Sequence, residues 1–123
     1  MPAEKRTIII VDDDKSILSV FTRVLEKKGY VVTTAENGKD CMDKIEHFHF
    51  SAALIDVCLP DMMGIDILPK IYQTSPKTVK IVFTGSPYLE ALKVGNEYID
   101  AFLVKPIKPE LLLNILEEKL KAK

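Results

Sequence analysis

The feature that most constrains this chain is a run of β-branched residues, Thr7 to Val11, that ends abruptly in Asp12, Asp13 and Asp14. A short apolar run without polar alternation is typical of a strand that is buried on both faces. Strands of that kind belong almost only to parallel sheets with helices on both sides. The run therefore predicts an α/β fold whose first strand opens into a polar loop.

The rest of the chain alternates between strand and helix patterns. Further strands are predicted over 30–35, 52–56, 79–84 and 101–104, and helices are predicted to begin near Asp14, Asn37, Ile65, Pro87 and Pro109. The helix beginning near Pro87 is short, runs to Val94 and is closed by Gly95. Pro69 is tolerated best in a first turn, so the third helix should start late or bend. The predicted apolar helix faces are Ile17, Leu18, Phe21, Val24 and Leu25; Cys41, Met42, Ile45 and Phe48; Ile65, Leu68, Ile71 and Tyr72; and Leu111, Leu112, Ile115, Leu116 and Leu120. Five strands alternating with five helices predict one doubly wound parallel sheet covered on two faces.

Length and charge narrow the possible functions. The 123 residues predict one domain, 1–123, and the 17 basic and 18 acidic side chains give a net charge of -1. Such a chain has no basic field for direct nucleic acid binding. No apolar stretch approaches the roughly 20 residues that span a bilayer, and no signal-peptide pattern begins the chain. The two cysteines lack close metal-ligand spacing, so a reducing, cytoplasmic location is expected.

Polar residues gather where four of the predicted strands end. Asp12 and Asp13 follow the first strand, Asp56 ends the third, Thr84 ends the fourth and Lys105 follows the fifth. In a parallel sheet these positions share one edge, where the binding sites of such folds lie. Three carboxylates about 5 Å apart repel by roughly 3 kcal/mol per pair at an effective dielectric near 20, so the cluster requires a cation. Oxygen ligands without His or Cys favour Mg²⁺.

The same residues could perform phosphoryl transfer. A carboxylate attacks phosphorus to form an aspartyl phosphate when a metal and a cation neutralise the charge on the transferred oxygens. Lys105 offers that cation and Thr84 a hydroxyl donor.

Four motifs, in order and correctly spaced, resemble the receiver domains of two-component response regulators. They are Ile-Ile-Val-Asp12-Asp13-Asp14, Leu-Ile-Asp56-Val-Cys-Leu-Pro60-Asp-Met-Met-Gly64, Ile-Val-Phe-Thr84-Gly85 and Phe-Leu-Val-Lys105-Pro106. The resemblance extends from Ile8 to Leu120. It implies a flavodoxin-like sheet with strand order 2-1-3-4-5.

The resemblance also implies roles for individual residues. Asp56 would accept the phosphoryl group, and Asp12, Asp13, Asp56 and the main-chain carbonyl of Cys58 would hold Mg²⁺. Lys105 would pair with the phosphoryl group, and the Lys105-Pro106 bond would be cis. Thr84 and Phe102 would be the switch residues, although many receiver domains have Tyr where this chain has Phe102.

Partners follow from the same resemblance. A sensor histidine kinase or a histidine phosphotransfer protein would donate the phosphoryl group, and an effector protein or a missing output domain would read the switch. The helix predicted from Pro87, the strand 101–104 and the last helix would form the output face and could support a weak homodimer. The chain would not be an enzyme beyond its own phosphorylation and dephosphorylation.

Two other functions remain possible. Asp12-Asp13-Asp14-Lys15-Ser16 also fits the short Asp-x-Asp-x-Ser/Thr pattern of haloacid-dehalogenase-like phosphatases, but that interpretation leaves Asp56 unexplained. A non-phosphorylated adaptor of the same fold would not need the intact set of Asp, Thr and Lys residues. Flavin binding is disfavoured because the acidic first loop would repel a flavin phosphate. For single residues, ordinary explanations are preferred: Asp14 as a helix cap, His47 and His49 as surface residues, Cys58 as unreactive and Leu113 as core.

Overall fold

The computed structural model describes residues 6–85 and 97–122. Five parallel strands form one sheet in the order β2-β1-β3-β4-β5, which confirms the expected topology. The strands are β1 (Thr7–Val11), β2 (Val31–Ala35), β3 (Ala52–Asp56), β4 (Val79–Thr84) and β5 (Ala101–Val104).

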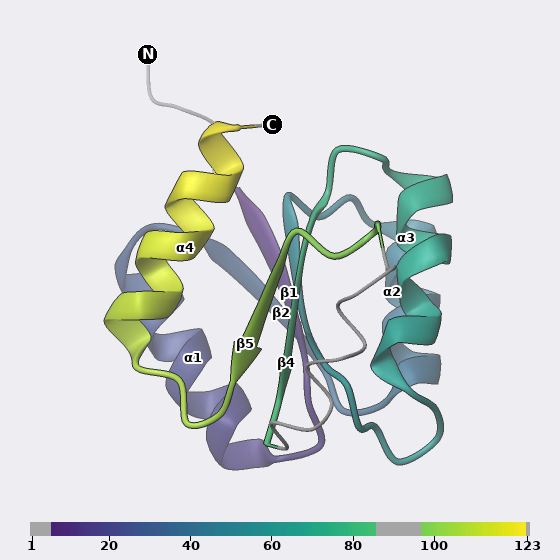
Figure 1. The fold of residues 1–123 in the computed structure, drawn as a ribbon, viewed down its shortest axis with the longest axis horizontal. Helices are drawn as coiled ribbons and strands as arrows, with labels where there is room; N and C mark the ends of the chain where they lie inside the picture. The colour runs from purple at the N-terminus through teal and green to yellow at the C-terminus, as the bar shows by residue number, and fades with distance from the viewer. Residues whose placement is uncertain (1–5, 86–96, 123) are drawn as a thin grey trace.

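Helices cover both faces of the sheet (Figure 1). One face carries α1 (Lys15–Lys27) and α4 (Pro109–Lys121), and the other carries α2 (Gly38–His47) and α3 (Leu68–Thr74). A short 3-10 turn, η1 (Gly64–Ile67), leads into α3. The helix predicted from Pro87 to Val94 lies outside the described residues.

Two apolar cores lie on the two faces of the sheet, and β1 contributes to both. Ile8 and Ile10 pack in the core under α1 and α4, whereas Ile9 and Val11 pack in the core under α2 and α3. All four side chains are fully buried. This double burial explains why β1 has no polar residue after Thr7, and it places the sheet's polar groups at the strand ends.

The expected boundaries of α1 and the expected late start of α3 are present. The Asp14 carboxylate accepts hydrogen bonds from the backbone N–H groups of Ser16 and Ile17 and so caps α1. Gly29 has a φ of +94°, a left-handed conformation that stops the chain from continuing the helix. Pro69 lies in the first turn of α3, where its missing N–H costs no helical hydrogen bond.

Three predicted core residues are exposed instead. Phe48 is 65% exposed because α2 ends at His47 and the chain turns extended there, while Phe50 is buried. Tyr72 is 47% exposed and packs against the ring of Tyr98. Leu111 is 49% exposed because α4 buries the stripe that contains Leu112, Leu113, Leu116 and Leu120.

The core assignment of Leu113 is therefore confirmed. Among the described residues, no helix is long and apolar enough to cross a bilayer.

Candidate functional site

The carboxylates predicted to converge do lie together at the carboxyl ends of β1 and β3. Val11 of β1 pairs with Ile55 of β3, so the residues that follow them, Asp12 and Asp56, lie side by side at the ends of two adjacent strands. Carboxylate oxygens of Asp12, Asp13 and Asp56 all lie within 4.8 Å of one another. Asp12 is fully buried, Asp56 is 6% exposed and Asp13 is open to solvent. The cluster thus has two buried members and one that reaches solvent.

Lys105 enters this cluster from the end of β5. Its Nζ donates hydrogen bonds to Asp12 Oδ2 at 2.8 Å and to Asp56 Oδ2 at 3.1 Å. Its backbone N–H donates to the Thr84 carbonyl at 2.7 Å, and the Lys105-Pro106 peptide bond is cis. The ammonium also lies 5.2 Å from the centre of the Phe83 ring. Lys105 therefore connects the first, third and last strands of the fold at one point.

Burial and pairing shift the pKa values of this group. Burial raises the pKa of Asp12, although the hydrogen bonds from Lys105 and from the Asp14 N–H act in the opposite direction. Burial alone would lower the pKa of Lys105, but its hydrogen bonds and charge interactions with Asp12 and Asp56 raise it overall. Lys105 consequently stays protonated, and one ammonium faces three carboxyl groups. The cluster retains an excess of negative charge that favours a further cation.

The donor set fits a hard divalent cation. Asp12, Asp13 and Asp56 supply carboxylate oxygens, and within the described residues no His or Cys thiolate joins this group. Mg²⁺ takes such oxygen ligands through one or two carboxylates while it keeps several waters. Cys58 lies on the loop between β3 and η1, and its N–H donates to Asp56 Oδ1 at 3.1 Å, so its main chain is held beside the cluster.

Thr84 and Phe102 lie on the neighbouring strands. Thr84 ends β4, is 1% exposed and pairs with Val104. Phe102 pairs with Val82 and packs, half-buried, against the core under α2 and α3. Thr84 follows Phe83, the partner of Asp56, so it lies one position beyond the carboxylate on the next strand.

Two residues of the loop after β3, Asp61 and Gly64, were given no role of their own from the sequence. The Asp61 carboxylate accepts hydrogen bonds from the backbone N–H groups of Gly38 and Lys39, at 2.8 and 2.9 Å. These bonds lower the pKa of Asp61. A Cβ on Gly64 would lie 2.0 Å from the Asp56 carbonyl oxygen, so only glycine fits there. The turn-rich loop composition hinted at Gly64, whereas nothing in the local sequence indicated the partner of Asp61.

Several alternative sites lose support from the geometry. The Asp14 carboxylate is engaged in capping α1, which leaves the phosphatase pattern without its second aspartate. His47 Nδ1 lies 2.8 Å from the Asp43 carbonyl and His49 Nδ1 lies 3.3 Å from Ser75 Oγ, and both residues are exposed. The buried Cys41 has its pKa raised to about 12 by burial, so its thiol is unreactive at neutral pH.

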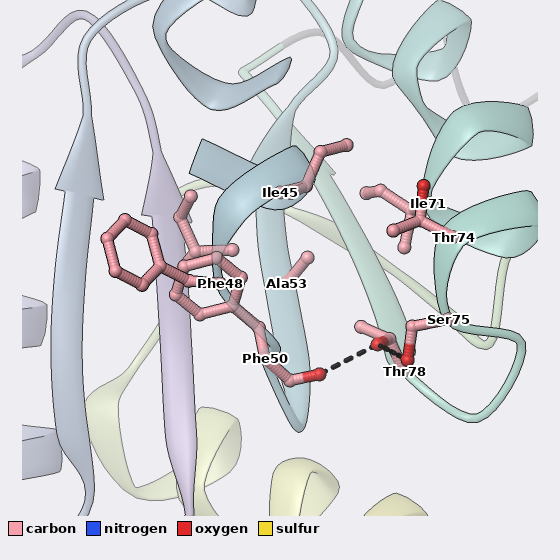
Figure 2. A pocket seen from close by; sticks show the side chains of 9 residues that line it. Ile45, Phe48, Phe50, Ala53, Ile71, Thr74, Ser75 and Thr78 are labelled. Carbon is pink, nitrogen blue, oxygen red and sulfur yellow. Dashed lines mark hydrogen bonds between the residues drawn. The ribbon is translucent and has the colours of Figure 1, made fainter. Parts of the chain in front are cut away.

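A small cavity lies on the side of the sheet that α2 and α3 cover, near the starts of β3 and β4; Figure 2 shows the side chains that line it. Side chains of α2, α3 and β3 point into it, and the Thr78 hydroxyl donates to the Phe50 carbonyl at 2.7 Å at its edge. Its internal volume of about 10 Å³ leaves room for one water at most. This cavity is therefore a packing gap and offers no site for a larger ligand.

Five parallel strands in this order, with clustered carboxylates and a lysine at their carboxyl ends, define the receiver class of signalling domains. Residues 8–117 match the model of the response regulator receiver domain family. The chain belongs to this family.

Known relatives agree with that assignment. A CheY-like receiver domain protein from Methanospirillum hungatei JF-1 is 38% identical, with a TM-score of 0.88, over 97% of this chain and 96% of that one. The BeF₃-activated receiver domain of DrrB is 33% identical, with a TM-score of 0.85, over 96% of this chain and 99% of that one. The transcriptional regulatory protein YkoG of Bacillus subtilis is 33% identical over 89% of this chain and 49% of its own length. The chain spans about half or less of the first curated relatives that it matches.

Proposed function

We propose that this receiver domain takes a phosphoryl group onto Asp56 and thereby switches a surface that another protein or domain reads. The observation that carries the proposal is the contact of Asp56 with Lys105 inside a cluster of three carboxyl groups. Such a cluster binds a cation and offers a carboxylate nucleophile at the same point. Asp56 is the member of the cluster that Lys105 and the Cys58 N–H both orient.

The donor in this proposal is a phosphohistidine. A carboxylate oxygen of Asp56 attacks phosphorus, the O–P bond forms, the N–P bond breaks, and the released imidazole takes up a proton. The Lys105 ammonium neutralises charge on the phosphoryl oxygens, and the Thr84 hydroxyl at the end of β4 donates to one of them. Asp56, Lys105 and Thr84 all belong to this chain, so in this proposal the chain catalyses only its own phosphorylation and dephosphorylation.

Asp12, Asp13, Asp56 and the Cys58 carbonyl would hold Mg²⁺. When bound, Mg²⁺ supplies charge neutralisation for the phosphoryl oxygens. Asp12 makes its own contribution without the ion, because its buried carboxylate holds the Lys105 ammonium in place beside Asp56.

A shallow apolar groove beside Lys105 suits the donor protein. Ile17, Val20 and Phe21 of α1 line it together with Pro106 and Ile107, and Val20 is 44% exposed. Lys105, which contacts Asp56, also lines the groove. A donor protein that brings phosphohistidine to Asp56 would therefore cover the groove. A histidine kinase or phosphotransfer protein with an apolar helix face would bury this surface.

The switch in this proposal consists of Thr84 and Phe102. Movement of Thr84 toward a phosphoryl oxygen frees space on the sheet face where Phe102 packs, and an inward shift of Phe102 alters the surface around β5. The exposed Val104 and Leu111 lie on β5 and α4 and are available to an effector, an output domain or a second copy.

Free Cys41 and Cys58 thiols suit a reducing, cytoplasmic location.

Intact-protein mass spectrometry tests the chemistry. Wild type incubated with acetyl phosphate and Mg²⁺ should gain one phosphoryl group, and Asp56→Asn should gain none. Asp43→Asn, at an exposed position on α2, is the matched control and should label like wild type. An adduct that persists in Asp56→Asn would refute the assignment, and the absence of any adduct on wild type would favour the adaptor function.

A second experiment isolates the donor surface. Val20→Lys should label normally with acetyl phosphate, because the substitution leaves Asp56 and Lys105 untouched. Transfer from a phosphorylated phosphotransfer protein that labels wild type should slow by tenfold or more. Equal transfer rates would show that the donor does not use the groove.

A further inference from the structure

We propose that Asp61 is a positioning residue for the cation site: it ties the loop after β3 to the amino end of α2 and so holds the Cys58 main chain against Asp56. The proposal rests on the proposed metal site and adds a residue that does not itself touch the ion. Three sets of contacts connect Asp61 to the carboxylate cluster.

The first contact joins two segments that are far apart in sequence. Asp61 Oδ1 accepts from the Gly38 N–H at 2.8 Å and Oδ2 accepts from the Lys39 N–H at 2.9 Å. Both donors belong to the first turn of α2, where the backbone N–H groups lack partners within the helix. The positive end of the helix dipole favours a carboxylate there. Asn37, the local cap, already accepts from the Asp40 N–H at 2.8 Å, so Asp61 satisfies different groups of the same turn.

The second contact is a close approach of Met62 to Gly38. A Cβ on Gly38 would lie 2.4 Å from both Cγ and Sδ of Met62. The missing side chain at Gly38 therefore leaves a notch that the half-buried Met62 occupies. Asp61 and Met62 together fix the tip of the loop to α2 by two polar contacts and one packed contact.

The third set of contacts carries this constraint from the tip to the site. The Leu59 N–H donates to the Met62 carbonyl at 3.1 Å, and Cys58 and Met63 form an antiparallel bridge. The Gly64 N–H donates to the Val57 carbonyl at the base of the same loop. The loop is thus a small closed hairpin with Asp61 at its tip. Cys58 lies near its base, where its N–H donates to Asp56 Oδ1 at 3.1 Å.

Fixing the tip should matter most for the ion. A main-chain carbonyl ligand has no rotamer of its own, so its position depends on the loop that carries it. Partners behind the ligands of metal sites typically change metal affinity by about 10- to 100-fold when they are removed. We therefore expect that loss of the Asp61 contacts lets the hairpin tip move and weakens Mg²⁺ binding.

The test compares two variants that each remove a side-chain cap from α2. Asp61→Ala removes the contacts that tie the hairpin to α2, whereas Asn37→Ala removes the local cap and leaves the hairpin in place. Isothermal titration of each folded protein with MgCl₂ gives the affinity, and the amide resonance of Cys58 reports the loop directly. Asp61→Ala should bind Mg²⁺ at least tenfold more weakly with a shifted Cys58 resonance, and Asn37→Ala should stay within twofold of wild type. Asp61→Asn, which keeps one acceptor oxygen, should fall between wild type and Asp61→Ala.

Two other outcomes would contradict the proposal. Equal losses of Mg²⁺ affinity in Asp61→Ala and Asn37→Ala would show that the affinity depends only on the stability of α2. An unchanged Mg²⁺ affinity in Asp61→Ala would show that the tether, the pair of hydrogen bonds from Gly38 and Lys39 to Asp61, is not needed. Either result overturns the proposal. If Asp61→Ala does not fold, Asp61→Asn carries the same comparison. A wild-type protein that labels on Asp56 but shows no difference among these variants would refute the tether alone, whereas a wild type that neither binds Mg²⁺ nor labels would refute the proposed function.

Discussion

Replacing Lys105 with methionine should make the stability of this protein depend strongly on divalent cations. Lys105 Nζ donates to Asp12 at 2.8 Å and to Asp56 at 3.1 Å, and the two carboxylates are almost fully buried. Methionine keeps most of the apolar stem, including its place beside the Phe83 ring, and removes the charge. The substitution therefore isolates the electrostatic part of the Lys105 contacts.

The magnitude follows from the distances in the cluster. Two charges 4.8 Å apart, the outer limit for these carboxylate oxygens, repel by about 3.5 kcal/mol at an effective dielectric near 20. Removing one partner of a buried ion pair costs about 3–5 kcal/mol, and the one-fifth exposure of Lys105 places the loss near the lower end, about 3 kcal/mol. In wild type the Lys105 ammonium repels a divalent ion bound to these carboxylates. Without that repulsion, the affinity of the variant for the ion should be about tenfold higher, which corresponds to about 1.4 kcal/mol. At an ion concentration about 100 times the variant's Kd the bound ion stabilises the variant by about 2.7 kcal/mol. Wild type gains only about 1.4 kcal/mol under the same condition.

Urea unfolding at pH 8 and constant ionic strength, with EDTA or with MgCl₂, measures these differences. Lys105→Met should be about 3 kcal/mol less stable than wild type in EDTA and less than about 2 kcal/mol less stable in MgCl₂. Lys108→Met, at an exposed position three residues further on, should match wild type in both buffers. A gap that is the same with and without Mg²⁺ would refute the idea that Lys105 and the ion neutralise the same carboxylates.

Three further changes test other parts of the structure. Gly64→Ala should cost about 2–3 kcal/mol of unfolding free energy in urea, because its Cβ would lie 2.0 Å from the Asp56 carbonyl oxygen; a cost below about 0.5 kcal/mol would contradict that geometry. Burial raises the pKa of Asp12, so this carboxyl group holds its proton to higher pH in the folded state than in the unfolded state. Ionisation of Asp12 therefore lowers the free energy of unfolding of wild type as pH rises. In EDTA, the stability of Asp12→Asn relative to wild type should therefore increase from about pH 4 upward and level off above the raised pKa, whereas a constant difference would be inconsistent with this shift. The side chain of Lys80 is 3% exposed and lies 3.6 Å from the Asp100 carboxylate, so Asp100→Ala should cost about 3 kcal/mol in urea and Lys80→Met less than about 1 kcal/mol; the reverse order would contradict the pairing.

The sheet could be predicted because its signals are local and repeated. The run Thr7–Val11 is buried on both faces, and each later strand begins or ends beside a turn signal. The exceptions lie where a helix ends or rotates. Phe48 has the right spacing for the α2 face, but the helix stops at His47 and Phe50 fills the apolar space instead. Leu111 belongs to an all-leucine stretch, in which periodicity alone does not choose the buried stripe.

The meeting of the carboxylates could be predicted because topology alone brings strand ends together. Asp12, Asp56 and Lys105 all lie at the carboxyl ends of strands of one parallel sheet, so their convergence needed no knowledge of side-chain packing. What topology did not indicate was which of these groups would contact one another. The Lys105 ammonium was expected beside a phosphoryl group, and in the structure it bridges Asp12 and Asp56. This contact follows from charge balance within the cluster, because no other described cation donates to these two carboxylates.

Neither the local sequence patterns nor the convergence of the strand ends could predict the contacts of the loop after β3. Asp61 meets Gly38 and Lys39 across 23 and 22 residues, and neither donor is a strand end or a patterned apolar position. Backbone N–H groups carry no sequence signal, so an acceptor for them can come from any loop that passes the helix terminus. The notch at Gly38 is equally invisible, because Asn37-Gly38 is also an ordinary turn signal. Long-range contacts to backbone atoms are thus the part of this site that requires coordinates, and they are also the contacts that join the loop after β3 to α2.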